Sequence, residues 1–414
     1  MKAIVLHHLG VPCVCQIKKT SGETVELTTK FFLNPDALIR IEPGGAIILP
    51  PQLYSTFLHI DQELLEKIMT SNEISVLDWP KETFDLLFLN QVIIAQKKEG
   101  SSPRVLRVGV AGLPNQVLFE VTPACQCDCE QCYHKQDLGG LSPSLSALRQ
   151  RVDKLKELGV GMFEVTGGEP LLQKCLPEIL NYIDGQGLHF YVVTNGEYLC
   201  EASPELLSAL SRGLGIAVSL DGVDEVHDQV RHRPGLYDKI LEGLEIVADY
   251  GINVYFISTL SSYNISSIPG MIALASKYKT TIHLRPAINT GSARDNNLSL
   301  DLRPFIGDYL SNPSVRNGLL STKKTIPEAK YYGCGIRKRI SVDSYGNLFP
   351  CVMDRSRKLS RIMDYNESSL VEELEKETSH FLKNNKKCLE CKFVSSGKEL
   401  ICGGACRFSK FYKS

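Results

Sequence analysis

This chain of 414 residues has no excess of charge of either sign and no long apolar run. Its 46 lysine and arginine residues nearly balance 47 aspartate and glutamate residues, so the formal net charge is -1. Such a balance gives no electrostatic support for nucleic acid or an anionic membrane as a partner. The apolar run that follows Met1 is too short for a signal peptide, and no later stretch approaches the length of a membrane helix. We therefore expect a cytoplasmic protein that binds neither nucleic acid nor membrane.

Cysteine, in contrast, is abundant, with 14 in the chain. Clustered cysteines in a reducing compartment more often bind metal than form disulfides. At a C-x3-C-x2-C spacing, Cys125, Cys129 and Cys132 can each bind one iron of a [4Fe-4S] cluster, which leaves the fourth iron without a protein ligand. The alternative is a structural zinc site, although zinc usually takes two C-x2-C pairs. Cys127 falls outside the iron–sulfur spacing, so we expect it not to be a ligand.

Residues 1–100 have the pattern of a small separate domain. Turns rich in proline and glycine separate three short apolar or alternating runs, which predict strands at 37–41, 46–49 and 56–60. Asp61 is placed to cap a following helix that buries Leu64, Leu65 and Ile68. A second helix is predicted before Val92, because apolar residues repeat there at helical spacing.

Residues 112–311 alternate buried strands with helices. Near-continuous apolar runs are typical of parallel strands covered on both faces, and they occur at 117–121, 162–166, 189–193, 215–219, 253–257 and 281–284. Apolar residues at helical spacing occupy 145–158 and 240–247, and glycines end both segments. Repeated units of this kind predict the α/β class with a partial (β/α)6 barrel.

Polar motifs follow four successive predicted strands. In order, they are the cysteine group at 125–132, Thr166-Gly-Gly-Glu-Pro170, Val193-Thr-Asn-Gly196 and Ser219-Leu-Asp-Gly222. Barrel enzymes build their sites at the carboxyl ends of the strands, so we expect the motifs to meet at one rim. Beyond the fourth motif, His227 and Asp228 are expected to stabilise the loop that leads to Arg231.

This order of motifs resembles the radical S-adenosylmethionine (radical SAM) superfamily over about residues 115–300. The resemblance implies that Cys125, Cys129 and Cys132 hold the [4Fe-4S] cluster, whose open iron binds the methionyl group of S-adenosylmethionine. One electron from the reduced cluster would then release a 5′-deoxyadenosyl radical that abstracts a substrate hydrogen. By the same resemblance, the remaining contacts to S-adenosylmethionine come from Gly167, Gly168, Glu169 and Pro170 (amine), Ser219 (ribose), Arg231 (carboxylate) and Asn195 on the same rim.

One position departs from the family pattern. The aromatic residue that usually precedes the third cysteine and packs near adenine is Gln131 here, while Tyr133 follows Cys132. The adenine contact is therefore not assigned. For Asn195, a plain turn role is the alternative, because Asn-Gly is itself a turn signal.

A second group of cysteines occupies residues 312–414, where we place a bridging region and a third domain. Their spacing resembles the SPASM extension, which binds auxiliary iron–sulfur clusters in many radical SAM enzymes. The resemblance implies one cluster on Cys334, Cys351 and Cys406, and a second on Cys388, Cys391 and Cys402. Each set has three cysteines, so each cluster could keep an open iron, or the six could rearrange around one four-cysteine cluster. A zinc knuckle is a further alternative for the last four cysteines. Val352 replaces the aspartate of sulfatase-maturing enzymes, which argues against that chemistry.

The three predicted domains together resemble maturases of ribosomally synthesised peptides. The pattern of residues 1–100 resembles winged-helix modules that capture a leader peptide as an added edge strand. The resemblance implies a precursor peptide as substrate, a thioether or carbon–carbon crosslink or epimerisation as reaction, and a reductant such as flavodoxin or ferredoxin. The catalytic base is not identified. Two alternatives are a radical SAM enzyme that acts on a small molecule or a folded protein, and a non-catalytic iron–sulfur or zinc protein that binds peptide.

Overall fold

The computed structural model describes residues 30–51, 58–71, 73–75, 81–95, 98, 102–133, 140–287, 291–298, 315–317, 338–351, 355 and 357–383. The chain divides into two compact units, one of Met1–Ile39 with Gly44–Arg104 and one of Arg40–Pro43 with Val105–Ser414. Within the described ranges, no helix has the length and apolar character needed to cross a membrane.

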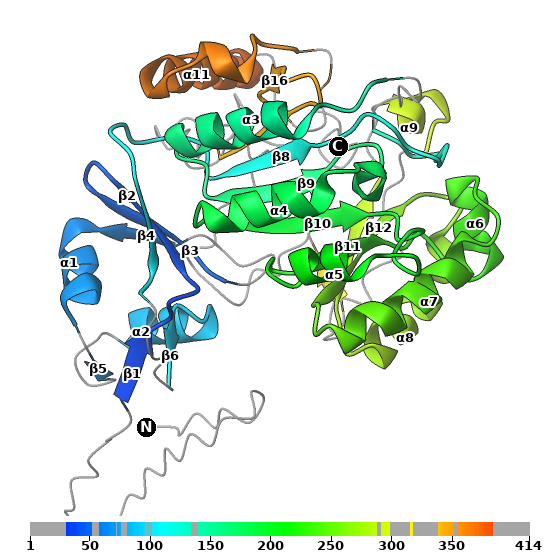
Figure 1. Ribbon diagram of the computed structural model, residues 1–414, viewed down its shortest axis with the longest axis horizontal. Helices are drawn as coiled ribbons and strands as arrows, with labels where there is room; N and C mark the ends of the chain where they lie inside the picture. Colours follow the sequence, from blue (N-terminus) through cyan, green and yellow to red (C-terminus); the bar gives the residue numbers. More distant parts are fainter. Residues whose placement is uncertain are drawn as a thin grey trace, which may run out of the picture. The chain divides into compact units, whose positions relative to one another are not determined.

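The described residues of the first unit form short strands and two helices (Figure 1). Its elements are β1 (Lys30–Leu33), β2 (Leu38–Glu42), β3 (Gly45–Leu49), β4 (Leu58–Asp61), α1 (Gln62–Thr70), β5 (Ile74–Ser75), α2 (Lys81–Leu89) and β6 (Ile93–Ile94). The strand orders are β5-β1-β6 in one sheet and β4-β3-β2-β7 in another, where β7 is Arg104–Arg107. The three predicted strands correspond to β2, β3 and β4 and are confirmed, whereas β1 was not predicted.

Helix α1 begins where the sequence predicts. Asp61 is its N-cap, and the Asp61 Oδ1 atom accepts a hydrogen bond of 2.8 Å from the backbone N–H of Leu64. Leu65 and Ile68 are buried, whereas Leu64 is only half-buried. The cap satisfies one of the backbone donors that the first turn of a helix leaves without a partner.

The described part of the second unit is built on one nine-stranded sheet, whose strands β8 to β13 run from cyan to yellow in Figure 1. Its strands are β8 (Gln116–Glu120), β9 (Met162–Thr166), β10 (His189–Thr194), β11 (Ile216–Ser219), β12 (Val254–Leu260), β13 (Ile282–Pro286), β14 (Val315–Asn317), β15 (Arg339–Val342) and β16 (Leu348–Phe349). The order is β14-β13-β12-β11-β10-β9-β8-β15-β16, and only the β15–β16 pair is antiparallel. The six predicted strands are β8 to β13, so the predicted partial α/β barrel is confirmed.

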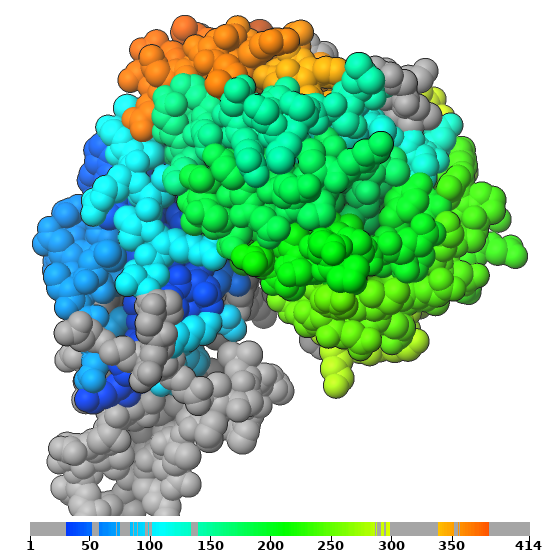
Figure 2. Space-filling view, viewed as in Figure 1, coloured from blue at the N-terminus to red at the C-terminus, as the bar shows by residue number. Residues whose placement is uncertain are grey.

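Helices follow the strands, as the alternation predicts. They are α3 (Leu145–Glu157), α4 (Leu176–Gly185), α5 (Pro204–Leu210), α6 (Glu225–Arg231), α7 (Leu236–Asp249), α8 (Ile268–Lys277), α9 (Gly291–Asp295) and α11 (Glu367–Lys383), with 3-10 turns η2 (Pro170–Leu172), η3 (Ile265–Ser267) and η5 (Ile362–Asp364). Helix α3 buries Leu148, Val152 and Leu155 completely, and Gly159 ends it at a φ of +80°, which favours glycine. In Figure 2 the side chains of α3, α4 and α5 form a continuous surface over the sheet.

The two faces of the sheet differ in polarity. On one face, Phe119 pairs in register with Val165, and both are fully buried. On the other face, Glu164 accepts hydrogen bonds from Tyr191 of β10 and Arg339 of β15, and it lies 3.3 Å from the amide of Gln116. The polar face is therefore turned toward the inside of the barrel, where a substrate can be held.

The chain returns to the barrel after residue 311. Strand β14 pairs with β13, and β15 adds to the other side of the sheet by pairing with β8. The domain predicted for 312–414 falls largely outside the described residues, as do Val352 and the cysteines Cys334, Cys388, Cys391, Cys402 and Cys406. Cys351, which follows β16, is described and is half-buried.

Candidate active site

The loop that follows β8 carries the first cysteine group, which we call the cysteine loop (residues 121–133). Cys125 and Cys127 are buried, with 8% and 3% of their surface exposed, and Cys129 and Cys132 are partly exposed. Among the described residues, none of these four cysteines is in a disulfide. The loop begins at the carboxyl end of β8, the first strand of the barrel, which is the position that the sequence predicts for it.

The Gly-Gly-Glu motif after β9 packs directly on the start of the cysteine loop. The backbone N–H of Gly168 donates to the Thr122 carbonyl at 2.9 Å, and that of Glu169 donates to the Ala124 carbonyl at 2.7 Å. A Cβ atom on Gly168 would lie 2.2 Å from the Ala124 carbonyl oxygen, and one on Gly167 would lie 2.3 Å from the Thr122 carbonyl oxygen. The glycines are therefore needed for the approach of the protein's own backbone, a role that the sequence prediction did not include.

The Glu169 carboxylate joins the second motif to the third. Its Oε1 atom accepts hydrogen bonds from the Leu171 N–H at 3.0 Å and the Thr194 hydroxyl at 2.7 Å, and Oε2 accepts from the Asn195 N–H at 2.7 Å. Burial raises the pKa of Glu169 to about 7 although these hydrogen bonds oppose the shift. The first bond caps η2, which begins at Pro170. Glu169 thereby fixes the ends of β9 and β10 against each other.

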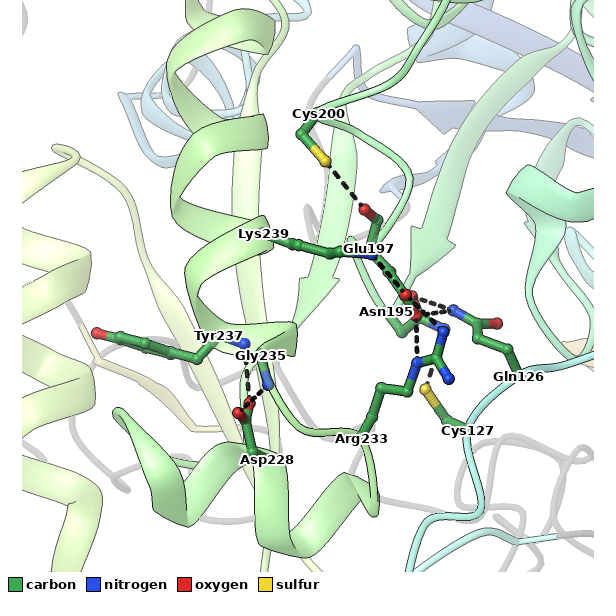
Figure 3. A network of polar contacts seen from close by, with 10 residues as sticks. All are labelled: Gln126, Cys127, Asn195, Glu197, Cys200, Asp228, Arg233, Gly235, Tyr237 and Lys239. Carbon is green, nitrogen blue, oxygen red and sulfur yellow. Dashed lines mark hydrogen bonds and ion pairs between the residues drawn. The ribbon is translucent and has the colours of Figure 1, made fainter.

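A buried amide and a buried carboxylate after β10 hold the cysteine loop from a second side (Figure 3). The Gln126 Nε2 atom donates to Asn195 Oδ1 at 3.2 Å and to Glu197 Oε2 at 2.7 Å. The Asn195 Nδ2 atom also donates to the Cys127 sulfur at 3.5 Å. Asn195 therefore contacts the cysteine loop, and the contact comes from its side chain.

Glu197 is itself fixed by two cations. Arg233 binds both carboxylate oxygens, at 2.9 and 2.8 Å, and Lys239 binds Oε1 at 3.0 Å. Burial raises the pKa of Glu197, but the hydrogen bonds from Arg233, Gln126 and Lys239 outweigh burial and lower it to about 2. A charged, fourfold hydrogen-bonded carboxylate of this kind is a fixed anchor for the loop.

We expect Glu197→Gln to lower the free energy of unfolding of the apo-protein by about 1–3 kcal/mol at pH 7, since hydrogen bonds to charged groups are lost. A carboxylate with a depressed pKa stabilises the fold above its unfolded pKa, and that stabilisation is lost as the pH falls toward the folded value. The difference between wild type and variant should therefore shrink from pH 5 toward pH 2. Denaturant unfolding at several pH values measures this difference in the free energy of unfolding. A difference that does not change with pH would contradict the role of the Glu197 charge.

The fourth motif holds the cysteine loop through Asp221, which is fully buried at the end of β11. Its Oδ2 atom pairs with the Arg231 guanidinium at 2.5 Å and accepts from Gln131 Nε2 at 2.5 Å, and Oδ1 accepts from the Thr259 N–H at 2.6 Å. Arg231 also donates through Nη1 to the Cys129 sulfur at 3.5 Å. Gln131, which departs from the family pattern, thus belongs to the same buried network.

The segment predicted as a loop before Arg231 is helix α6, which carries His227, Asp228 and Arg231; His227 contacts the fourth motif, and Asp228 contacts the turn that follows Arg231. His227 Nδ1 accepts from the Asp221 N–H at 3.0 Å, and burial lowers the pKa of His227 to about 3, so the ring stays neutral. Asp228 accepts from the backbone N–H groups of Gly235 and Tyr237 at 2.5 and 2.9 Å (Figure 3).

Helix α9 and the residues just after it contact the C-terminal part of the cysteine loop. The Ser292 N–H donates to the Cys132 carbonyl at 2.8 Å, and Asn296 Nδ2 donates to the Glu130 carbonyl at 3.0 Å. A Cβ atom on Gly291 would lie 2.4 Å from the Cys132 carbonyl oxygen. The loop is therefore fixed by four segments that are far apart in the sequence.

The structure brings the predicted residues of the four motifs to one rim. Ser219, at the end of β11, is half-buried and lies in register with Ile257 and, one strand further, His283. Sequence reasoning missed Gln126, Asp221, Glu197 and Arg233. Asp221 was visible inside the Ser-Leu-Asp-Gly motif, whereas nothing near Glu197 marks it as an anchor.

The donor set of the cysteine loop fits an iron–sulfur cluster. A single metal ion needs ligands that converge on one point, and among the described residues no three His, Cys, Asp or Glu side chains do so. In a [4Fe-4S] cluster each thiolate binds a different iron, and Cys125, Cys129 and Cys132 supply three thiolates on one short, fixed loop. The guanidinium of Arg231 beside Cys129 favours the thiolate form that metal binding requires.

The chain is similar to one family model and to several known proteins. Residues 119–275 match the family model of the Radical SAM superfamily. Among curated proteins, the chain is 29% identical over 199 residues to the antilisterial bacteriocin subtilosin biosynthesis protein AlbA of Bacillus subtilis, covering 47% of this chain and 44% of AlbA. It is 28% identical over 165 residues to Fe-coproporphyrin III synthase of Methanosarcina barkeri, covering 39% and 41%. It is 27% identical over 176 residues to PqqA peptide cyclase of Xanthomonas euvesicatoria, covering 42% and 47%.

Solved structures share the fold over more of the chain. Streptococcus suis SuiB bound to its precursor peptide SuiA matches with a TM-score of 0.65 and 14% identity, covering 91% of this chain and 95% of SuiB. Native anSMEcpe with bound AdoMet and a Cp18Cys peptide matches with a TM-score of 0.53 and 20% identity, covering 72% and 91%. The matched regions span less than half of each of the three curated relatives. The superfamily implies a [4Fe-4S] cluster and S-adenosylmethionine as cofactors. By this match, residues 119–275 of the chain are a radical SAM domain.

Proposed function

We propose that this protein is a radical SAM enzyme that modifies a ribosomally synthesised peptide by hydrogen abstraction. The observation that carries the chemistry is the cysteine loop, which Gly168, Asn195, Asp221 and Ser292 hold from four segments. When bound, the reduced cluster supplies the electron that cleaves S-adenosylmethionine and yields a 5′-deoxyadenosyl radical. Cys125, Cys129 and Cys132 would hold the cluster, and the motif residues Gly167, Gly168, Glu169, Pro170, Asn195, Ser219 and Arg231 would bind S-adenosylmethionine.

Several relatives favour a peptide as the substrate. The names of AlbA and PqqA peptide cyclase refer to bacteriocin biosynthesis and to a peptide, and SuiB is seen with a precursor peptide. In the first unit, β4 ends the order of the four-stranded sheet, and its residues alternate between buried and exposed. An extended leader peptide can add to such an edge through backbone hydrogen bonds. We therefore assign residues 1–100 to leader recognition and the barrel interior to the modified segment.

The remaining assignments follow from the same proposal. Residues 312–414 would form a SPASM-like domain whose cysteines hold one or two auxiliary clusters: Cys334, Cys351 and Cys406, and Cys388, Cys391 and Cys402. The reaction would form a thioether or carbon–carbon crosslink or invert a stereocentre. A cytoplasmic location and electron supply from flavodoxin or ferredoxin would suit the reduced clusters.

A small-molecule substrate is the second candidate. Fe-coproporphyrin III synthase and AdoMet-dependent heme synthase of Methanosarcina barkeri are 28% and 27% identical to parts of this chain, so two relatives are named for tetrapyrrole chemistry. A tetrapyrrole enzyme would need the barrel and its cysteine loop but no leader-binding edge.

Assays of the purified protein distinguish the peptide-modifying enzyme from the tetrapyrrole enzyme. Anaerobically reconstituted protein with S-adenosylmethionine and dithionite should form 5′-deoxyadenosine, and failure to form it would refute the radical SAM activity. A peptide encoded by a short open reading frame beside the gene should then lose about two hydrogens on crosslinking, or take up one solvent deuterium on epimerisation. Fluorescence anisotropy should show that its labelled leader binds the full chain. If 5′-deoxyadenosine forms, no such peptide binds or changes mass, and coproporphyrin is converted, the tetrapyrrole candidate is correct.

A further inference from the structure

The inner face of β13 carries a cation that the proposed radical chemistry does not use. On the neighbouring strand β12, the Ser258 hydroxyl contacts the Met271 sulfur of α8 at 3.5 Å, so this face of the sheet is turned toward the helices. Leu284 of β13 lies in register with Ser258 and is 1% exposed. Successive side chains of a strand point to opposite faces, so His283 and Arg285 point toward the inside of the barrel.

The inner face of β13 is continuous with the rim that carries the motifs. Ser219 lies in register with Ile257, and Ile257 lies in register with His283. Arg285 is two residues further along β13, in register with Thr259. Ser219, Thr259, His283 and Arg285 are only half-buried. Arg285 therefore lies near the carboxyl end of its strand, where barrel enzymes bind their substrates.

Arg285 differs from other arginines at this face in its partner. Three ion pairs at the inner face or its rim each join one arginine to one carboxylate, and they are Arg339–Glu164, Arg355–Glu120 and Arg231–Asp221. Arg285 has a histidine in that place, since its Nε and Nη2 atoms lie 3.4 and 3.2 Å from His283 Nδ1. Within the described ranges, no carboxylate forms an ion pair with Arg285.

The contact with His283 leaves one edge of the guanidinium for a ligand. A guanidinium can only donate, so His283 Nδ1 accepts and carries no proton. Contacts from described residues use only Nε and Nη2 of Arg285, and the edge formed by Nη1 and Nη2 can bind further acceptors. A charge that is partly withdrawn from water is stabilised by a counter-ion. Two parallel N–H groups of a guanidinium match the two oxygens of a carboxylate, so a carboxylate is the ligand that fits this position.

We propose that Arg285, oriented by His283, binds a carboxylate of the peptide segment that is modified inside the barrel. The carboxylate would come from an aspartate or glutamate side chain of that segment or from the C-terminus of the peptide. This assignment rests on the proposed peptide-modifying function and adds the chemistry of the segment that the barrel selects. Arg285 is therefore a specificity-determining residue, which holds the segment through an ion pair and paired hydrogen bonds.

The test measures kcat/KM for modification of the peptide encoded by the short open reading frame beside the gene, with mass spectrometry as the readout. Arg285→Gln should lower kcat/KM by about 10- to 100-fold, because charge-assisted hydrogen bonds are lost. Arg285→Lys should lower it less, since the ammonium keeps the charge but not the planar fork. Circular dichroism checks that both variants fold.

A set of altered peptides identifies the carboxylate. Each acidic residue is changed singly to its amide, and one further peptide has an amidated C-terminus. Wild-type protein should modify one of these peptides about 10- to 100-fold more slowly than the unchanged peptide. Arg285→Gln should modify that peptide no more slowly than the unchanged one, because the two changes remove the same contact. The altered peptides test the wild-type protein even if Arg285→Gln does not fold.

Arg212→Gln is the matched control, because Arg212 is 54% exposed and pairs with Asp184 at the surface. Its kcat/KM should equal that of the wild type. Weaker S-adenosylmethionine binding by Arg285→Gln, measured by calorimetry without peptide, would assign the guanidinium to the cofactor and overturn the proposal. Equal rates for all altered peptides with wild-type protein would overturn it as well. If the wild type modifies no peptide, the proposed function itself fails and this assignment falls with it, so the two failures are distinguishable.

Discussion

Asp221→Ala will lower the free energy of unfolding by about 3–5 kcal/mol, the range found when one partner of a buried ion pair is removed. The variant leaves the guanidinium of Arg231, whose side chain is only 13% exposed, without the carboxylate 2.5 Å away. It also removes the acceptor of Gln131 and of the Thr259 N–H. Burial alone would lower the pKa of Arg231, but Asp221 and the neighbouring cysteines outweigh burial and raise it, so Arg231 stays charged.

Denaturant unfolding of the reduced apo-protein under anaerobic conditions measures this change without any contribution from the cluster. Glu157→Ala is the matched control, because it breaks the Lys154–Glu157 pair at 2.8 Å, in which the Glu157 side chain is 58% exposed, and surface pairs are worth about 0–1 kcal/mol. The decrease in the free energy of unfolding in Asp221→Asn should fall between those of Asp221→Ala and Glu157→Ala. The amide keeps an acceptor for the Thr259 N–H but loses the charge. If Asp221→Ala lowers the free energy of unfolding by no more than Glu157→Ala does, then water reaches Arg231 and the network does not hold the loop.

The sheet could be predicted from the sequence because its strands are buried on both faces. Parallel strands of this kind appear as apolar runs, and Met162–Thr166 was located to the residue. The short strands β14 and β15 have no such run, and their place depends on pairing with β13 and β8. A prediction from local pattern cannot supply that long-range pairing.

The candidate site could be predicted as a set of motifs but not as a packed structure. The cysteine spacing and the strand ends were enough to place Cys125, Glu169 and Arg231 on one rim. Glu197 was not predicted, because its partners Gln126 and Arg233 lie 71 and 36 positions away and each has an ordinary local role. The contact of Gly291 with the Cys132 carbonyl also exists only in the folded chain.

Gly168→Ala is expected to reduce cluster binding about tenfold or more, because overpacking typically costs about 1–3 kcal/mol and 1.4 kcal/mol is a factor of ten. The new Cβ atom would lie 2.2 Å from the Ala124 carbonyl oxygen, 2.5 Å from the Ala124 carbonyl carbon and 2.7 Å from the Pro123 carbonyl oxygen. These are backbone atoms, which cannot rotate away as a flexible side chain does. The start of the cysteine loop must therefore shift, and Cys125 shifts with it.

Iron content after anaerobic reconstitution measures the effect, with circular dichroism as a check that the fold is retained. Gly185→Ala is the matched control, since nothing lies within 4 Å of a Cβ atom at that position at the end of α4. The same pair of variants decides what the glycine motif is for. If Gly168→Ala loses iron, the motif serves the approach of the cysteine loop, as the 2.9 Å hydrogen bond to Thr122 indicates. If it keeps iron and loses only S-adenosylmethionine binding in calorimetry, the glycines serve the ligand, and the loop can adjust to the added methyl group.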